Sequence, residues 1–142
     1  MEKDKTAQSL VVLLDQYKAD RNPLTTLALM TGMPKATFYL IEEHHNGTPN
    51  QTATKNSQYW RTFQTKDGKQ YLQTFTSLDK ASAQLSEGAD ANVQHLNFNQ
   101  IALMVMNDAN ALEGYVVDPE HSNAKFNRNI IEKIWRYAMN HV

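Results

Sequence analysis

The chain has 142 residues, a formal net charge of −1, and 41% hydrophobic residues. This is the length and composition of one globular domain. Its 14 basic and 15 acidic residues form no basic block or stripe, which argues against binding to nucleic acid or to an anionic membrane. Cysteine is absent, so disulfides, thiol catalysis and cysteine-ligated metals are excluded. We expect a soluble, cytoplasmic protein that forms a single domain over residues 1–142.

Two helices are expected at the start of the chain. Apolar residues recur at helical spacing over residues 6–19 and predict an amphipathic helix. A second, shorter helix has signals at both ends. Asn22 can cap it, and Pro23 suits its first turn. Gly32 can end it in a left-handed conformation, and Pro34 prevents its continuation.

A buried strand is predicted over residues 38–41, where the chain is continuously apolar. Residues 42–58 follow, with Ala53 as their one apolar residue. Nothing in this stretch can anchor a packed conformation, so it is expected to form a polar, mobile loop.

The clearest local prediction is a β-hairpin. Residues 59–65 and 70–75 are rich in aromatic and β-branched side chains and flank a turn at 66–69. Asp67 and Gly68 supply the positive φ angles of this turn. Trp60 falls on the more polar of the two faces.

After the hairpin, predicted helices alternate with predicted strands. We expect a helix from Leu78 to Gly88, a weak strand or loop over 92–97, a helix over 98–106, a strand over 114–117 and a final helix whose apolar side runs from Ile130 to Ala138. The order predicts an α+β domain, with a single mixed β-sheet that has a central hairpin and is covered by several α-helices.

Four pieces of the chain, in this order, carry a family resemblance. They are the strand "FYLIEE" with a variable polar insert after it, the hairpin leading into "FTSLDKA", the strand "GYVVDP", and a last helix containing "NIIEKIW". Over residues 22–136 the chain resembles the N-terminal domain of the SseB family, the bacterial "enhanced serine sensitivity" proteins. The resemblance implies a bacterial cytoplasmic domain of undefined molecular activity, and it brings no catalytic residues. It would place Asn-Pro where this chain has Asp118 and Pro119.

The start of the third helix allows two interpretations. Ser77 and Lys80 have the spacing of a serine nucleophile and a lysine base. Thr76 to Asp79 also match a capping box, in which the Thr76 hydroxyl meets the Asp79 amide and Lys80 lies exposed. We favour the cap. An anion site at this helix start is a weaker alternative.

Two further groups of residues are candidate sites. His44 and His45 adjoin Glu42 and Glu43, but they lie on the predicted mobile loop, so no metal site and no other cofactor is expected. The loop from Asp118 to Asn123 could pair Asp118 with His121 as base and orienting group, although the same residues are typical of a turn.

The favoured function is a non-catalytic binding or adaptor domain that recognises a protein or a small polar ligand through one sheet face and the adjoining loops. Tyr59 and Trp60 are expected to be exposed and to contribute. The alternative is a small-molecule sensor or enzyme, which requires the Thr76/Ser77 helix start and the Asp118–Asn123 loop to converge in a pocket. A homodimer formed through the hairpin or a terminal helix is also left open. The candidate binding residues are Tyr59, Trp60, Thr76, Ser77, Asp118 and His121.

Overall fold

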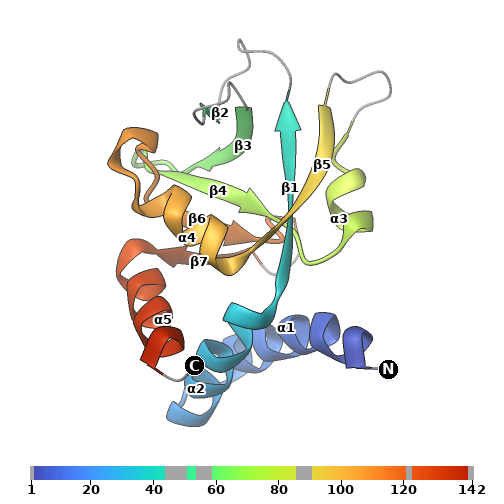
Figure 1. Ribbon diagram of the computed structural model, residues 1–142, viewed down its shortest axis with the longest axis vertical. Helices are drawn as coiled ribbons and strands as arrows, with labels where there is room; N and C mark the ends of the chain where they lie inside the picture. The colour runs from blue at the N-terminus through green and yellow to red at the C-terminus, as the bar shows by residue number, and fades with distance from the viewer. Residues whose placement is uncertain (1, 44–50, 54–58, 86–90, 121–122, 141–142) are drawn as a thin grey trace.

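The computed structural model describes residues 2–43, 51–53, 59–85, 91–120 and 123–140 (Figure 1). The helices are α1 (Glu2–Ala19), α2 (Pro23–Gly32), α3 (Leu78–Ser82), α4 (Phe98–Met106) and α5 (Arg128–Asn140), with 3-10 turns η1 (Met33–Lys35) and η2 (Asp108–Asn110). The strands are β1 (Thr37–Glu43), β2 (Gln51–Ala53), β3 (Tyr59–Gln64), β4 (Gln70–Thr74), β5 (Ala91–Asn97), β6 (Gly114–Val117) and β7 (Ala124–Asn127). None of the described helices is both long and apolar enough to cross a membrane.

The strands form one mixed sheet with the order β5-β1-β3-β4-β6-β7, and β2 pairs with β3 beside this path. The pair β4 and β6 is parallel, whereas the other strand pairs between described residues are antiparallel. The predicted α+β fold with a central hairpin is therefore confirmed. The parallel pair is the feature that arranges the candidate sites, because it brings like ends of β4 and β6 together.

The predicted cap of α2 is confirmed, but the predicted role of Gly32 is wrong. Asn22 accepts a hydrogen bond from the Thr25 amide, and the Thr25 hydroxyl accepts one from the Asn22 amide. Gly32 has a right-handed conformation with φ −81°, and the chain continues directly into η1. A Cβ atom at Gly32 would collide with Leu13 Cδ1, so glycine here allows α1 and α2 to pack closely.

The predicted hairpin is confirmed, with Thr62 opposite Leu72. Gly68 alone in its turn has a positive φ, of 86°, and its amide donates to the Thr65 carbonyl. The second positive φ expected at Asp67 is therefore wrong. The predicted alternation of the β3 side chains is confirmed, but the expected exposure of Trp60 is wrong, because Trp60 is only 4% exposed and belongs to the main core.

Three stretches differ from their expected structure. Glu42 and Glu43 belong to β1, and residues 51–53 form β2, so these parts of 42–58 are not loop. The remainder of that stretch lies outside the described residues. β7 was not predicted, since Phe126 is its only large apolar residue. α3 is shorter than expected, and its predicted end at Gly88 also lies outside the described residues.

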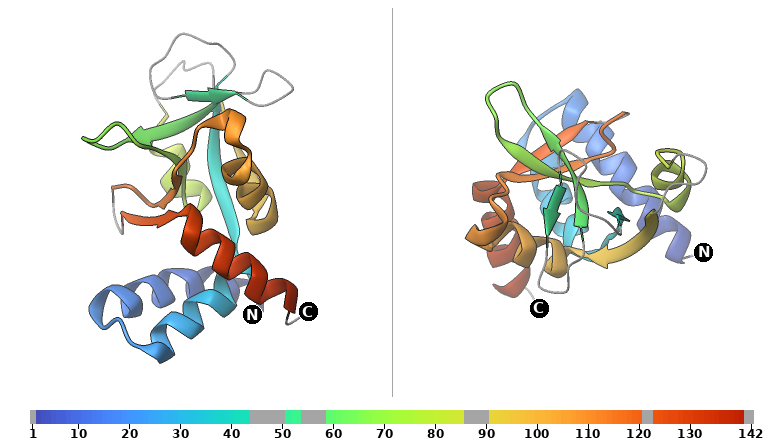
Figure 2. Two further views of the ribbon diagram at one scale, coloured as in Figure 1. Left: turned by 90° about the vertical axis from the view of Figure 1, so that its left-hand side faces the viewer. Right: turned by 90° about the horizontal axis from the view of Figure 1, so that it is seen from above.

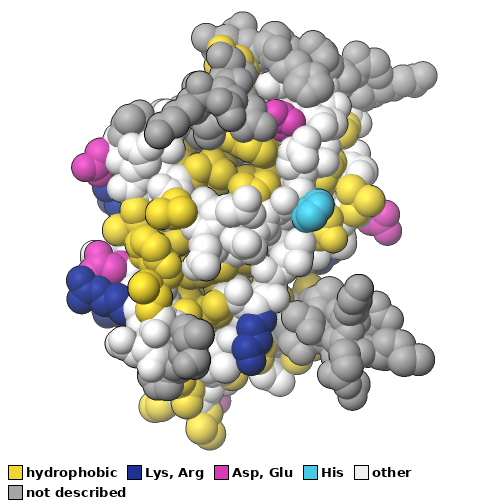
Figure 3. All heavy atoms as spheres, viewed as in Figure 1, with side chains coloured by type: hydrophobic (Ala, Val, Ile, Leu, Met, Phe, Trp, Pro, Cys, Tyr) yellow, Lys and Arg dark blue, Asp and Glu magenta, His cyan; other side chains and the backbone are white. Residues whose placement is uncertain are grey.

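The sheet has a large core on one face and a small one on the other. The main core joins one face of the strands to α1, α2, α4 and α5 (Figure 2). The smaller core of Ile41, Phe75 and Ala81 lies beneath α3. On the surface viewed in Figure 3, Lys and Arg side chains are scattered singly, and hydrophobic side chains gather over α4, where Leu103 is 58% exposed.

Candidate functional site

The parallel pairing of β4 and β6 brings two of the predicted site segments together. Thr74 lies opposite Val117 at the carboxyl ends of the strands. The segments that follow therefore meet. The Thr76 amide donates to Asp118 Oδ1 at 2.9 Å, and the Thr76 hydroxyl donates to Asp118 Oδ2 at 2.7 Å.

Asp118 is fully buried, with an exposed fraction of 0%. Its φ of 47° is left-handed, a conformation that aspartate and asparagine tolerate better than most residues. Lys80 Nζ lies 3.1 Å from Asp118 Oδ2 and 3.0 Å from the Thr76 hydroxyl, so the buried carboxylate has a cationic partner. We call Thr76, Lys80 and Asp118 the Asp118 cluster. Its hydrogen bonds and its ion pair connect the end of β4 with the end of β6 and with α3.

The structure shifts the predicted helix cap by one residue. Ser77, not Thr76, is the N-cap of α3, and its hydroxyl accepts from the Lys80 amide at 3.2 Å. Thr76 is instead committed to Asp118, and Lys80 is not a freely exposed side chain. A serine–lysine catalytic pair needs a lysine that can take up a proton. Here Lys80 is the ion-pair partner of a buried carboxylate, and no hydrogen bond joins its ammonium to the Ser77 hydroxyl. The contacts of Lys80 therefore indicate a role in stabilising the fold.

Tyr59 and Trp60 do not join this cluster. Tyr59 is half-buried on β3. Trp60 is buried, which overturns its expected exposure, and its Nε1 has no hydrogen-bond partner among the residues that the structure describes. His121 lies outside the described residues.

The acidic residues that could have joined a histidine site are likewise in the sheet. Glu43 is 5% exposed and pairs with Arg61 at 3.0 Å, while Glu42 accepts a hydrogen bond from Gln94. His44 and His45 lie outside the described residues. Both carboxylates therefore contact side chains of the neighbouring strands.

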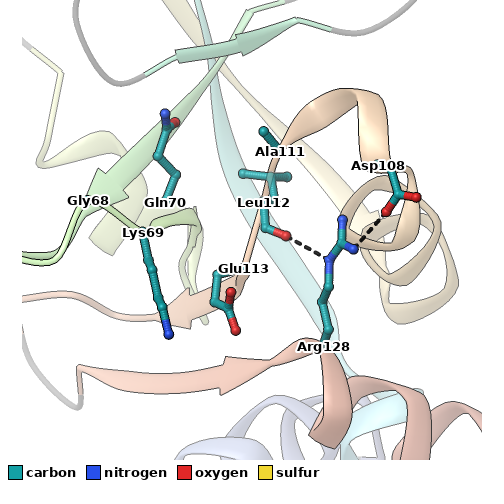
Figure 4. A pocket seen from close by; sticks show the side chains of 8 residues that line it. All are labelled: Gly68, Lys69, Gln70, Asp108, Ala111, Leu112, Glu113 and Arg128. Carbon is teal, nitrogen blue, oxygen red and sulfur yellow. Dashed lines mark hydrogen bonds and ion pairs between the residues drawn. The ribbon is translucent and has the colours of Figure 1, made fainter.

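A cavity that the sequence did not predict lies at the opposite, amino-terminal ends of β4 and β6. It has a volume of about 440 Å³, and we call it the Glu113 groove (Figure 4). Its lining residues are Gly68, Lys69, Gln70, Asp108, Ala111, Leu112, Glu113 and Arg128.

Backbone hydrogen bonds hold the Glu113 groove in shape. The Glu113 amide donates to the Gln70 carbonyl at 2.7 Å, and the Arg128 amide donates to the Glu113 carbonyl at 2.9 Å. The Arg128 guanidinium donates to the Leu112 carbonyl and to Asp108 Oδ1, at 2.9 and 2.8 Å. Segments from the hairpin, the β6 entry and the start of α5 are therefore fixed relative to one another.

The Glu113 groove presents both signs of charge. The Glu113 carboxylate lies between the Lys69 and Arg128 side chains (Figure 4). The Lys69 side chain is 53% exposed. Its Nζ lies 4.0 Å from Asp67 Oδ2, which is long for an ion pair, so the ammonium stays accessible. Burial, with the charge of Glu113 as a smaller contribution, raises the pKa of the adjacent Tyr71. Lys69 and Glu113 are far apart in the sequence, so only the strand pairing could reveal their proximity.

Comparison with known proteins identifies the family. The family model for the SseB protein N-terminal domain matches residues 10–133, which are most of the chain. Searches of curated proteins and of solved structures gave no match. The match agrees with the resemblance seen in the four sequence pieces. This chain therefore belongs to the SseB protein N-terminal domain family.

Proposed function

We propose that this chain is a non-catalytic binding domain that recognises a partner protein through the Glu113 groove. The observation that carries the proposal is the position of the Glu113 carboxylate. It lies in an open cavity whose backbone is held by hydrogen bonds, and the Lys69 and Arg128 side chains line the same cavity. A partner segment with a basic side chain for Glu113 and an acidic one for Lys69 would match these charges.

The size of the groove also favours a protein partner. A cavity of about 440 Å³ can take one or two side chains, and it is open rather than enclosed. Stable protein interfaces bury about 800 Å² on each partner, so the groove would be the specific centre of a larger contact. The Asp118 cluster supports the absence of catalysis, because its polar groups are engaged with one another.

A charge-reversal experiment tests the groove. Tagged wild type, Glu113→Lys and Asp15→Lys would be used to recover partners from a lysate of the native host, and the recovered partner would then be purified for titration calorimetry. Asp15 is exposed on α1 and does not line the groove, so its variant is the matched control. We expect wild type and the control to bind equally, and Glu113→Lys to lose binding. Equal binding by all three would refute the role of the groove.

A small-molecule sensor or enzyme at the Asp118 cluster is the second candidate. It is favoured by one observation, the meeting of Thr76 with Asp118. A ligand would have to reach a carboxylate that is 0% exposed and displace Lys80 from it. The candidate therefore ranks below the open groove. Protection of Lys80 from acetylating reagents by a metabolite would revive it.

A homodimer is the third candidate, and an apolar groove between α1 and α2 favours it. This groove includes Leu13, Leu24 and Leu27, of which Leu24 is 78% exposed and Leu27 46% exposed. Light scattering over a range of concentrations tests the candidate. A dimer would have twice the monomer mass of 16.2 kDa. Leu24→Gln should then restore the monomer, whereas a constant monomer mass for wild type would exclude self-association.

A further inference from the structure

The described strands leave one long edge of the sheet open. β5 is the outermost strand on its side, and among the described strands it pairs only with β1 (Figure 1). In an antiparallel pair every second residue directs its amide and carbonyl toward the partner strand, and the residues between them direct theirs away. β5 therefore presents a row of backbone hydrogen-bonding groups at the border of the sheet.

β5 lacks the features that usually keep another strand from pairing with an edge. It has seven residues, and none of them is a lysine, an arginine, an acidic residue or a proline. Its register with β1 runs unbroken from Ala91, opposite Glu43, to Asn97, opposite Thr37, so it contains no bulge. The edge strand at the other end of the sheet, β7, has four residues and includes Lys125. A short length and a lysine both protect an edge, so β5 is the edge that suits strand pairing.

The side chains of β5 show that the strand is accessible from both faces. Asn92 is exposed on one face, and His95 is exposed on the other. Ala91 and Val93 pack against the smaller core beneath α3 and are only half-buried. A strand placed beside β5 would cover more of this apolar surface and would extend the smaller core.

We propose that the open edge of β5 binds an extended segment of a partner protein, which adds to the sheet as a further strand. Strand addition takes its affinity from main-chain hydrogen bonds and its selectivity from alternate side chains. On the face with Val93 the partner's side chains would be small and apolar, and on the face with Gln94 they would be polar. The edge is separate from the Glu113 groove, so this proposal does not rest on the groove.

The dimensions of β5 favour a peptide segment over a second copy of the chain. Its seven residues span about 24 Å. A contact that is one strand wide is narrow for a stable dimer, which buries about 800 Å² on each partner. An extended segment needs no such area, because its own backbone makes the hydrogen bonds.

Amide hydrogen exchange of the free protein, followed by NMR, tests whether the edge is open. We expect alternation along β5, with slow exchange at the amides that face β1 and fast exchange at the amides between them. Slow exchange at every β5 amide would overturn the proposal, because the edge would then already be covered. If that protection appears only at high protein concentration, a second copy is the occupant, which would overturn the partner segment as well.

Two proline substitutions locate the outward amides. Gln94 and His95 are neighbours, so the amide of one faces β1 and the amide of the other faces outward. Proline removes the amide, and an edge strand tolerates it where that amide faces outward. We expect one of Gln94→Pro and His95→Pro to keep a thermal stability close to that of its matched alanine variant, and the other to be clearly less stable. Equal losses in both would contradict the open edge.

A phage-displayed library of random peptides of about twelve residues, long enough to span β5, supplies the probe. Phage that bind the stable proline variant are removed first, and the remainder are selected on wild type. The recovered peptides should bind that variant at least about tenfold more weakly than wild type. Glu113→Lys is the control and should bind them like wild type, because Glu113 lies outside β5. The absence of binders after depletion, or loss of binding in Glu113→Lys, would refute a strand site at β5.

Methylation of the peptide backbone decides how the peptide binds, and it needs no protein variant. Each amide of a recovered peptide is N-methylated in turn, and the affinity for wild type is measured by titration calorimetry. An added strand should lose affinity at every second position and keep it at the positions between, because only alternate amides pair with β5. Sensitivity that does not alternate would overturn strand addition.

Discussion

The hydroxyl of Thr76 donates a hydrogen bond of 2.7 Å to the carboxylate of Asp118, 42 residues further along the chain. Asp118 also accepts from the Thr76 amide and pairs with Lys80. One buried carboxylate thus joins the ends of two parallel strands to the first turn of α3. Because of this ion pair, the contribution of Asp118 to stability depends on Lys80, and that of Lys80 depends on Asp118.

That dependence can be measured with a double-mutant cycle. Lys80→Met leaves a buried carboxylate without its cation and should lower the free energy of unfolding by about 3–5 kcal/mol. Asp118→Asn keeps a side chain suited to the left-handed φ and should cost less. Adding Asp118→Asn to Lys80→Met should restore most of the lost stability, because no unpaired charge remains. Urea unfolding of the four proteins measures this coupling, and additive losses would contradict it.

The role of Ser77 as a helix cap gives a second prediction. Ser77→Ala should lower the free energy of unfolding by about 1 kcal/mol, the usual cost of losing an N-cap. Ser82→Ala, at the exposed end of α3, is the control and should change stability little. A loss of any hydrolytic activity in Ser77→Ala, with stability unchanged, would favour the nucleophile instead.

The close packing of α1 and α2 reverses the usual effect of a glycine substitution. Gly→Ala inside a helix commonly stabilises it by about 1 kcal/mol. At Gly32 the new methyl group would meet only the end of the flexible Leu13 side chain, so Gly32→Ala should instead destabilise the fold, by no more than about 1 kcal/mol. Leu13→Ala in the same chain should relieve part of that cost. Chemical denaturation of the single and double variants decides the sign, and a stabilised Gly32→Ala protein would show that Leu13 moves aside freely.

Two tyrosines predict how stability changes in alkaline solution. Burial raises the pKa of Tyr115 well above its ordinary value of 10.0, and it also raises the pKa of Tyr71. Above pH 10 the unfolded chain loses these protons before the folded chain does. The free energy of unfolding should therefore fall as pH rises, by up to about 1.4 kcal/mol per pH unit for Tyr115 and by less for the only partly buried Tyr71.

Tyr115→Phe isolates the larger effect. The variant loses the hydrogen bond from the tyrosine hydroxyl to Met33 Sδ, so its stability at neutral pH should be lower. Its decline above pH 10 should be shallower than that of wild type, because one proton fewer is involved. Urea unfolding at several alkaline pH values measures both quantities. Equal slopes in the two proteins would contradict the assignment to Tyr115.

Several features of this protein were determined by the sequence itself, because their causes are local. Asn22 and Pro23 set the start of α2, since capping needs only residues three positions apart. Gly68 sets the hairpin turn through its own φ. The order of these elements was sufficient to predict the α+β class, and four short pieces indicated the family.

The tertiary structure decided which residues share a site. The alternation of β3 predicted two faces, but only the packing of the sheet against its helices determined that the face with Trp60 is buried. The parallel pairing of β4 with β6 joined Asp118 to Thr76 at one end and brought Glu113 near Lys69 at the other. Such pairing is decided by burial summed over the whole sheet, which no short stretch of sequence encodes.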